Sequence, residues 1–101
     1  MGEIWMADCG LVAKIRPVLV LAVFTDSDAR ALLTVAPLTS QLRGQRGEVP
    51  LGKINWLPKP STVNVQGLAA FSGRTLVRRL GALDKTAMNA VKDALRDWLD
   101  L

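Results

Sequence analysis

Residues 14–24 read Lys-Ile-Arg-Pro-Val-Leu-Val-Leu-Ala-Val-Phe, and this stretch decides the fold. The apolar run from Val18 to Phe24 is short and rich in β-branched residues, which favours a strand buried on both faces over a helix with a polar side. Pro17 suits the first position of such a strand, where no ladder N–H is lost. Because a residue before proline avoids the helical region, we expect Arg16 to be a stiffly held cation at the start of this strand.

A second apolar run predicts the neighbouring strand. It covers residues 31–38 and leads into a polar cluster, Thr39-Ser-Gln41. The segment between the two runs, Thr25-Asp-Ser-Asp28, is typical of a turn, so we expect an antiparallel hairpin. That pairing would place Arg16 beside Thr39, and a cation next to a hydroxyl suits a phosphate or another anion. Taken alone, the same residues also fit a solvated arginine and a strand-end threonine that bonds its own backbone.

The rest of the chain predicts a small, mostly antiparallel sheet or barrel. A loop is expected over Cys9–Ile15, and a polar, mobile loop over residues 39–47. Residues 76–83 fit either a strand or a short helical turn. The other predicted strands are Gly2–Asp8, Glu48–Leu51 and Thr62–Leu68.

The C-terminal segment predicts one helix packed on this sheet. Asp84 is a good N-cap, and Leu83 and Met88 suit a hydrophobic staple across it. Trp98 is expected to anchor the apolar face of the helix in the core or in a dimer interface. That face repeats at helical spacing and comprises Met88, Val91, Leu95, Trp98 and Leu99.

Length and composition narrow the class of protein. The 101 residues suit one domain, residues 1–101, of the α+β class and mainly β. No stretch reaches the roughly 20 apolar residues that span a bilayer, and the single cysteine, Cys9, allows no internal disulfide and fits a reducing cytoplasm. Because the chain has no histidine, histidine-based catalysis and the usual zinc sites are excluded, and we expect no metal or cofactor. The net charge of +4 favours a polyanionic partner.

Six segments, taken in order, carry a family resemblance. They are Gly2-Glu-Ile-Trp5, Arg16-Pro-Val-Leu-Val20, Ala36-Pro-Leu-Thr-Ser-Gln41, Glu48-Val-Pro-Leu51, Lys59-Pro-Ser61 and Arg78-Arg-Leu-Gly-Ala-Leu83. No single segment is strong evidence for a family, whereas the joint order and spacing of all six are specific to one. Over nearly its whole length the sequence resembles the MazF/PemK family of toxin–antitoxin endoribonucleases.

This resemblance implies a fold, an activity and partners. The implied fold is a small antiparallel barrel resembling the SH3 type with a C-terminal helix, usually a homodimer. The implied activity is metal-independent, sequence-selective cleavage of single-stranded RNA, with mRNA as the expected target, through attack of the ribose 2′-hydroxyl. A cognate antitoxin is expected to block the RNA groove. The family's catalytic arginine and threonine map onto Arg16 and Thr39.

RNA contacts are expected from the residues around this pair. Lys14, Arg43 and Arg46 are placed to follow the RNA backbone, with a solvated loop surface as the alternative. Ser40 and Gln41 are expected to bind phosphate or a base edge. The predicted substrate-binding residues are Lys14, Ser40, Gln41, Arg43 and Gln66.

Two segments depart from the family pattern. Cys9–Ile15 is shorter than the matching loop of many relatives, and Gln66-Gly-Leu-Ala-Ala70 stands where many carry an arginine and a threonine, which Gln66 partly replaces. These departures leave two alternatives open. One is a family member that binds RNA or an antitoxin without cutting, and the other is a non-enzymatic relative that binds a protein target such as gyrase. The presence of both Arg16 and Thr39 favours cleavage over the second.

Overall fold

The computed structural model describes residues 2–8, 15–24 and 32–101. The predicted turn at Thr25–Asp28 and all but the last residue of the predicted loop at Cys9–Ile15 lie outside these ranges. The described elements are β1 (Glu3–Ala7), β2 (Arg16–Phe24), β3 (Leu32–Thr39), β4 (Glu48–Gly52), β5 (Ser61–Asn64), the 3-10 helix η1 (Val65–Gly67), β6 (Ala69–Ser72), the 3-10 helix η2 (Gly73–Thr75), β7 (Leu76–Ala82) and the helix α1 (Lys85–Leu99).

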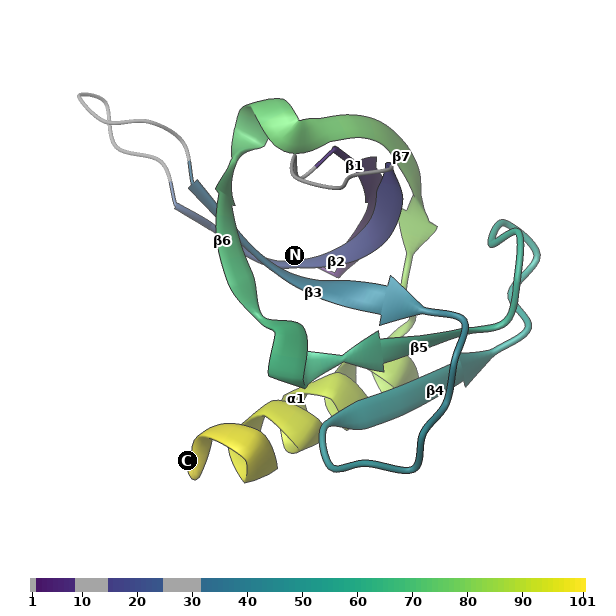
Figure 1. Ribbon diagram of the computed structural model, residues 1–101, viewed down its shortest axis with the longest axis vertical. Coiled ribbons are helices and arrows are strands. Elements are labelled where there is room, and N and C mark those ends of the chain that lie inside the picture. Colours follow the sequence, from purple (N-terminus) through teal and green to yellow (C-terminus); the bar gives the residue numbers. More distant parts are fainter. Residues whose placement is uncertain (1, 9–14, 25–31) are drawn as a thin grey trace.

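The described strands form one strongly curved antiparallel sheet (Figure 1). Their order is β4-β5-β3-β2-β1-β7, and β6 pairs with the first half of β3, residues 32–35. Residues 76–83, which fit two structures by sequence, form the strand β7 beside β1. Within the described residues no pairing joins β4 to β7, so the sheet is open. The α+β, mainly β fold with a C-terminal helix is confirmed.

The alternating residues of β2 face two different parts of the core. Leu19 and Leu21 belong to a larger cluster, which also receives the helix α1, and Val18 and Val20 belong to a smaller one. All four side chains are buried. Residues 18–21 thus have the two-sided burial that the apolar run predicts, whereas Ala22 and Val23, later in the same run, are exposed.

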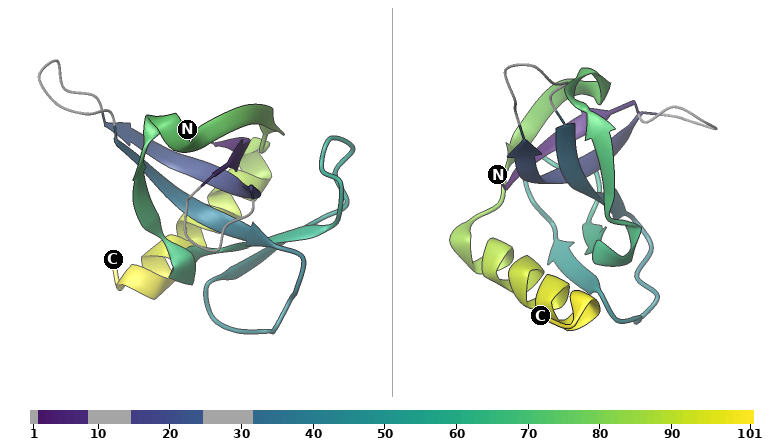
Figure 2. Two further views of the ribbon diagram at one scale, coloured as in Figure 1. Left: turned by 45° about the horizontal axis from the view of Figure 1, so that its top comes forward. Right: turned by 90° about the vertical axis from the view of Figure 1, so that its left-hand side faces the viewer.

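Helix α1 lies across one end of the sheet and packs against β4 and η1 (Figures 1 and 2). Asp84 caps it as predicted, because its carboxylate accepts a 2.8 Å hydrogen bond from the Ala87 N–H. Val91 is fully buried, and Met88 and Leu95 pack against the larger core cluster. Among the described residues, no helix is both long enough and apolar enough to cross a membrane.

Trp98 does not anchor the core, contrary to one of its two predicted roles. Its side chain is 37% exposed, and Leu99 beside it is 47% exposed. The Arg46 guanidinium instead lies over the Trp98 ring, 5.4 Å from its centre. The last turn of the helix therefore contacts the loop before β4 rather than the buried clusters, and a dimer interface at Trp98 stays a prediction.

The prediction of one strand over Thr62–Leu68 is wrong in its second half. β5 ends at Asn64, whose side chain accepts the Gln66 backbone N–H at 3.1 Å and thereby caps η1. Gly67 then passes so close to Pro37 that a Cβ would lie 2.6 Å from the proline Cγ. After this turn the chain resumes as β6, a strand that the sequence did not predict.

Candidate functional site

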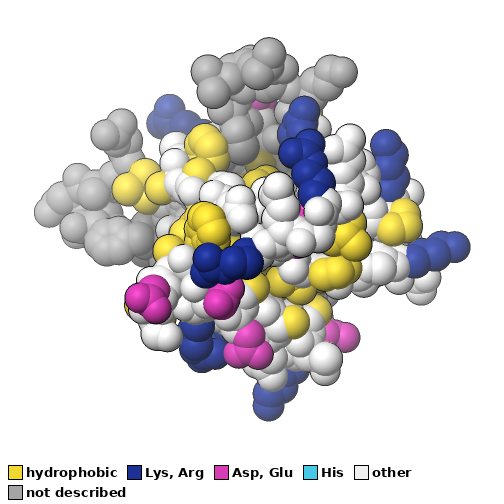
Figure 3. Space-filling model, turned by 60° about the horizontal axis from the view of Figure 1, so that its bottom comes forward, with side chains coloured by type: hydrophobic (Ala, Val, Ile, Leu, Met, Phe, Trp, Pro, Cys, Tyr) yellow, Lys and Arg dark blue, Asp and Glu magenta, His cyan; other side chains and the backbone are white. Residues whose placement is uncertain are grey.

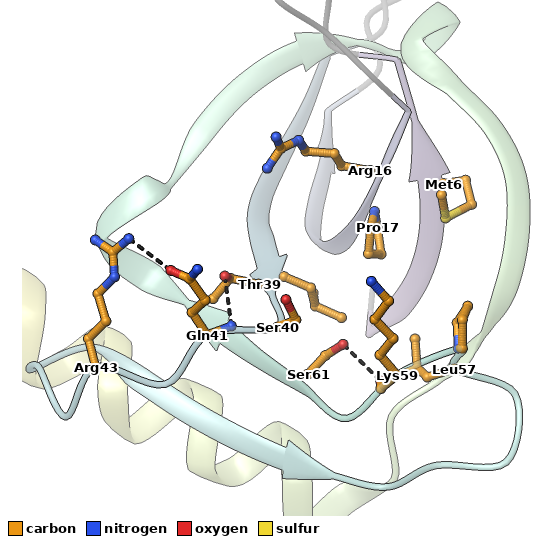
Figure 4. A pocket seen from close by; sticks show the side chains of 12 residues that line it. Met6, Arg16, Pro17, Thr39, Ser40, Gln41, Arg43, Leu57, Lys59 and Ser61 are labelled. Carbon is orange, nitrogen blue, oxygen red and sulfur yellow. Dashed lines mark hydrogen bonds between the residues drawn. The ribbon is translucent and has the colours of Figure 1, made fainter.

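A pocket of about 450 Å³ opens where β1, β2, β3 and the β4–β5 connection meet (Figure 4). Because its side chains come from segments far apart in the sequence, several strands must come together to build it. The lining residues are Met6, Arg16, Pro17, Leu38, Thr39, Ser40, Gln41, Arg43, Leu57, Pro58, Lys59 and Ser61.

Strand register explains why Arg16 and Thr39 share this pocket. β2 and β3 pair with Val18 opposite Pro37. Arg16 and Thr39 lie two residues beyond this last observed pair, each on its own strand, and both line the pocket. On its other side Thr39 pairs with Thr62 of β5. The two residues are therefore brought together at the ends of neighbouring strands, as the predicted hairpin requires.

The Thr39 hydroxyl takes part in a local hydrogen bond and still has a hydrogen to donate. Its Oγ1 accepts the Gln41 backbone N–H at 3.1 Å. A hydroxyl carries one hydrogen and two lone pairs, so this bond uses only acceptor capacity. Local backbone bonding and contact with a ligand, which the sequence presented as alternatives, are compatible at this residue.

The loop at residues 40–47, predicted to be mobile, carries a set of hydrogen bonds. The Arg43 guanidinium donates to Gln41 Oε1 at 3.0 Å (Figure 4). The Glu48 carboxylate accepts the backbone N–H of Arg43 at 3.1 and 3.2 Å and that of Gln45 at 2.7 Å. These bonds, first the one from Arg43, lower the pKa of Glu48 below its usual value near 4.5. Glu48 is therefore the carboxylate around which this loop is organised.

In the part of the chain that the structure describes, the charged residues that line the pocket are all cationic. They are Arg16, Arg43 and Lys59. Within the described parts of the chain, no carboxylate forms an ion pair with Arg16 or Lys59. The face that carries α1 differs, because acidic and basic side chains alternate there (Figure 3). Cations without carboxylate partners, set beside hydroxyl groups, favour the binding of an anion in the pocket.

Three other residues predicted to contact RNA are not among the lining residues. Lys14 lies outside the described residues. The Gln66 side-chain amide donates to the Arg46 carbonyl at 2.6 Å. Arg46 itself forms an ion pair with Asp97, with 3.1 Å between Nε and Oδ2, and also contacts Trp98. Arg46 therefore ties the loop to α1.

Lys59 and Ser61 line the pocket but were not predicted as site residues. The available signal was the segment Lys59-Pro-Ser61, one of the six that carry the resemblance. The sequence alone does not show that Thr39 pairs with Thr62, which brings this segment beside the end of β3. In the described ranges, no three His, Cys, Asp or Glu side chains are grouped so that they could hold a metal ion.

The chain is similar to known toxins over almost its full length. A family model described as the PemK-like, MazF-like toxin of type II toxin–antitoxin systems matches residues 1–99. Probable endoribonuclease MazF5 of Mycobacterium tuberculosis strain H37Rv is 33% identical over 100 residues, which cover 98% of this chain and 91% of that protein. The solved structure of Mycobacterium tuberculosis toxin MazF-mt6 is 32% identical with a TM-score of 0.80, covering 98% of this chain and 97% of that one.

A third likeness concerns the fold alone. A mycobacterial endoribonuclease solved in complex with its cognate antitoxin is 23% identical with a TM-score of 0.82, covering 99% of this chain and 93% of that one. The family match spans all the described strands and α1, and it confirms the resemblance expected from the six segments. The chain belongs to the PemK/MazF family of toxins of type II toxin–antitoxin systems.

Proposed function

We propose that the chain is an endoribonuclease toxin that cuts single-stranded RNA without a metal ion. The observation that carries the proposal is the pocket in which, among the described residues, the charged lining side chains are Arg16, Arg43 and Lys59 and Thr39 presents a hydroxyl. The names of its relatives, probable endoribonuclease MazF5 and endoribonuclease MazF3, support the same reaction.

RNA supplies its own nucleophile for this reaction. The ribose 2′-oxygen attacks the adjacent phosphorus, and the bond from phosphorus to the 5′-oxygen of the next nucleotide breaks. The 2′-hydroxyl loses a proton and the departing 5′-oxygen gains one, so the products are a cyclic phosphate and a 5′-hydroxyl. Negative charge accumulates on the phosphate oxygens in the transition state. A protein that positions the phosphate and stabilises this charge therefore accelerates the reaction.

Arg16 supplies the charge stabilisation in this mechanism. A planar guanidinium can donate to two phosphate oxygens at once, and Arg16 is held at the start of a paired strand. The Thr39 hydroxyl donates its hydrogen to a further phosphate oxygen or orients the attacking hydroxyl. Because arginine stays protonated, it does not relay the proton. The rate rests on electrostatics and positioning, which predicts a slow enzyme.

The neighbouring lining residues contact the RNA on either side of the cut. Gln41 and Arg43 stand on one wall of the pocket, and Lys59 stands on the opposite wall (Figure 4). Ser40 lies between them and offers a further hydroxyl. Each phosphate that a cation neutralises should add about 0.7 to the slope of log affinity against log salt for a single strand. Lys14 and Gln66 stay as predicted contacts, the second of them beyond the pocket lining.

Two protein partners complete the proposal. Membership of a type II toxin–antitoxin family calls for a cognate antitoxin protein, which we expect to cover the cationic pocket. A mycobacterial relative has been solved with its own antitoxin. We also infer a homodimer, and action in the cytoplasm, where single-stranded messenger RNA is found.

The test is RNA cleavage by the full chain in the presence of EDTA. Wild-type protein should cut a long single-stranded RNA at discrete positions and leave cyclic-phosphate ends, whereas Arg16→Ala should be slower by about 10²- to 10³-fold. Arg74→Ala is the matched control, because Arg74 is exposed and does not line the pocket. Equal cutting by Arg16→Ala would reject Arg16 as a catalytic residue. Binding of RNA by wild type without any cutting would leave the chain as a non-cleaving family member.

A further inference from the structure

Glu48 is the first residue of β4 and does not line the pocket. Its two carboxylate oxygens accept the Arg43 N–H at 3.2 and 3.1 Å, and one of them also accepts the Gln45 N–H at 2.7 Å. Both donors are backbone groups, so these bonds fix the path of the main chain rather than one side-chain rotamer. The carboxylate thereby holds the segment that carries Arg43 into the pocket.

The local backbone is shaped to enclose this carboxylate. Gly44 has φ +71°, a left-handed conformation that suits glycine. The two N–H groups that the Glu48 carboxylate binds, those of Arg43 and Gln45, lie on either side of this glycine in the chain. The negative charge of Glu48 is thus taken up by amides of its own loop and is not directed at the pocket.

Glu48 is itself held firmly by the sheet. It pairs with Asn64 of β5, and the next residue, Val49, is buried in the larger core cluster. Just before it, the Gly47 carbonyl accepts the Val65 N–H at 2.9 Å. The loop is therefore attached to a fixed point of the scaffold through the Glu48 carboxylate.

A chain of contacts runs from this fixed point to the proposed catalytic threonine. Glu48 fixes the backbone of Arg43, whose guanidinium donates to Gln41 Oε1 at 3.0 Å. The Gln41 N–H in turn donates to Thr39 Oγ1 at 3.1 Å. Each contact is within hydrogen-bond distance. A change at Glu48 would therefore move Arg43 and, through it, Gln41, whereas Thr39 stays fixed by its pairing with Thr62 of β5.

We propose that Glu48 is a positioning residue that sets RNA affinity by holding Arg43 in the pocket. This inference rests on the proposed function, because Arg43 is assigned there as an RNA contact. The carboxylate lies outside the lining, so its loss acts on substrate binding and leaves the catalytic step at Arg16 and Thr39 nearly unchanged. Glu48 should affect KM and the dissociation constant for RNA, and not kcat.

Glu48→Gln in the full chain is the direct test. Glutamine has nearly the same size but only one acceptor oxygen, and its NH2 group would face backbone donors. We expect the dissociation constant for a single-stranded RNA to rise about two- to fivefold, the effect of one exposed charge contact, with kcat unchanged. The slope of log affinity against log salt should fall by up to about 0.7. In an Arg43→Ala background the same substitution should have no further effect.

Glu3→Gln is the matched control. The Glu3 carboxylate also accepts a hydrogen bond, from Trp5 Nε1 at 2.9 Å, and forms an ion pair with Arg79, but it does not line the pocket. The Glu3→Gln substitution should leave RNA affinity unchanged. Gly44→Ala disturbs the same turn in a second way, because its Cβ would meet no atom within 4 Å but its φ is strained for alanine. It should weaken RNA binding in the same direction, which keeps the test available if Glu48→Gln does not fold.

The outcomes separate this inference from the proposed function. Three results would each overturn the positioning role. The first is unchanged RNA affinity in folded Glu48→Gln, and the second is an equal loss of affinity when Glu48→Gln is made in the Arg43→Ala background. The third is a loss confined to kcat. If Arg16→Ala abolishes cutting while Glu48→Gln behaves as wild type, the proposed function stands and this inference fails. If wild type binds RNA but does not cut it, the proposed function fails and the affinity series still decides the role of Glu48. Failure of wild type to bind RNA would overturn both.

Discussion

Gly81 of β7 leaves room for the Trp56 ring, and replacing it by alanine should destabilise the protein measurably. A Cβ at position 81 would lie 2.4 Å from Cε2 and 2.5 Å from Cδ2 of Trp56, whereas ordinary contact begins at 3.4 Å. The ring would have to move by about 1 Å. It packs against the larger core cluster, and Gly81 is fixed by its pairing with Ile4, so neither side can yield freely.

The expected cost follows from this overlap. Forcing an extra methyl group into a packed site costs about 1–3 kcal/mol. One kcal/mol shifts the Tm of a domain of about 100 residues by roughly 4–8 °C, so Gly81→Ala should lower the Tm by at least about 4 °C. Urea unfolding followed by tryptophan fluorescence gives the free energy of unfolding directly.

A double-mutant cycle with Trp56→Leu identifies the cause. If the ring is what the new Cβ meets, Gly81→Ala should cost little in the Trp56→Leu background, and the coupling energy should be about 1 kcal/mol or more. A loss below about 0.5 kcal/mol for Gly81→Ala, the usual range for a neutral surface change, would refute the argument. Strict additivity with Trp56→Leu would refute it equally, because the damage would then lie elsewhere.

Three further predictions concern the helix cap, the site hydroxyl and pH. Asp84→Ala should lower the free energy of unfolding by about 1 kcal/mol, measured by urea unfolding and far-UV circular dichroism, whereas Asp84→Asn should cost only a fraction of that. Thr39→Ser keeps the hydroxyl and should cut RNA at nearly the wild-type rate, whereas Thr39→Val should be slower by about 10²-fold or more in the same gel assay. The pKa values of Glu3 and Glu48 are lowered in the folded state, by the Trp5 hydrogen bond and the Arg43 N–H first. The two ionised carboxylates therefore stabilise the fold above their usual pKa near 4.5, and this stability is lost as the pH falls through the lower folded pKa values. The Tm of wild type should consequently fall more steeply below pH 4.5 than the Tm of a Glu3→Gln, Glu48→Gln double variant.

Each of these predictions has a contradicting result. Equal stability of the alanine and asparagine variants at Asp84 would mean that the cap bond contributes nothing. Cleavage by Thr39→Val at the rate of Thr39→Ser would remove the hydroxyl from the mechanism. Parallel Tm curves for wild type and the double carboxylate variant between pH 3 and 7 would show that the two lowered pKa values have no energetic consequence.

The elements predicted correctly are those that a pattern of neighbouring residues in the sequence specifies. The run from Val18 to Phe24 specifies a strand by composition, and this strand is buried over residues 18–21. Asp84 followed by a 3.6-residue period specifies the helix start. Arg16 and Thr39 could also be placed near each other, because each lies at the open end of its predicted hairpin strand, although the register shift between Val20 and Ala22 could not be foreseen. These parts of the fold needed no information from distant segments.

The elements missed depend on pairing between distant segments. The strand β6, at Ala69–Ser72, follows a 3-10 turn that Asn64 caps locally and in which Gly67 approaches Pro37, and this second contact cannot be seen in the local pattern. Lys59 joins the pocket only because β5 lies beside β3. Trp98 matches the helical period but lies beyond the end of the core, where only the Arg46 contact reveals its surroundings.

The pairing of β1 with β7 has a consequence for how this toxin is synthesised. Glu3 lies opposite Ala82, and the Leu83 N–H donates to the Gly2 carbonyl at 2.9 Å. The residues of the pocket lie between positions 6 and 61. However, β1 pairs with β7 as well as with β2, and β7 is made only when the ribosome reaches residue 82. A nascent chain therefore carries every cation of the site before it has the scaffold that holds them. The nascent chain should therefore cut RNA only after β7 has been made and has paired with β1.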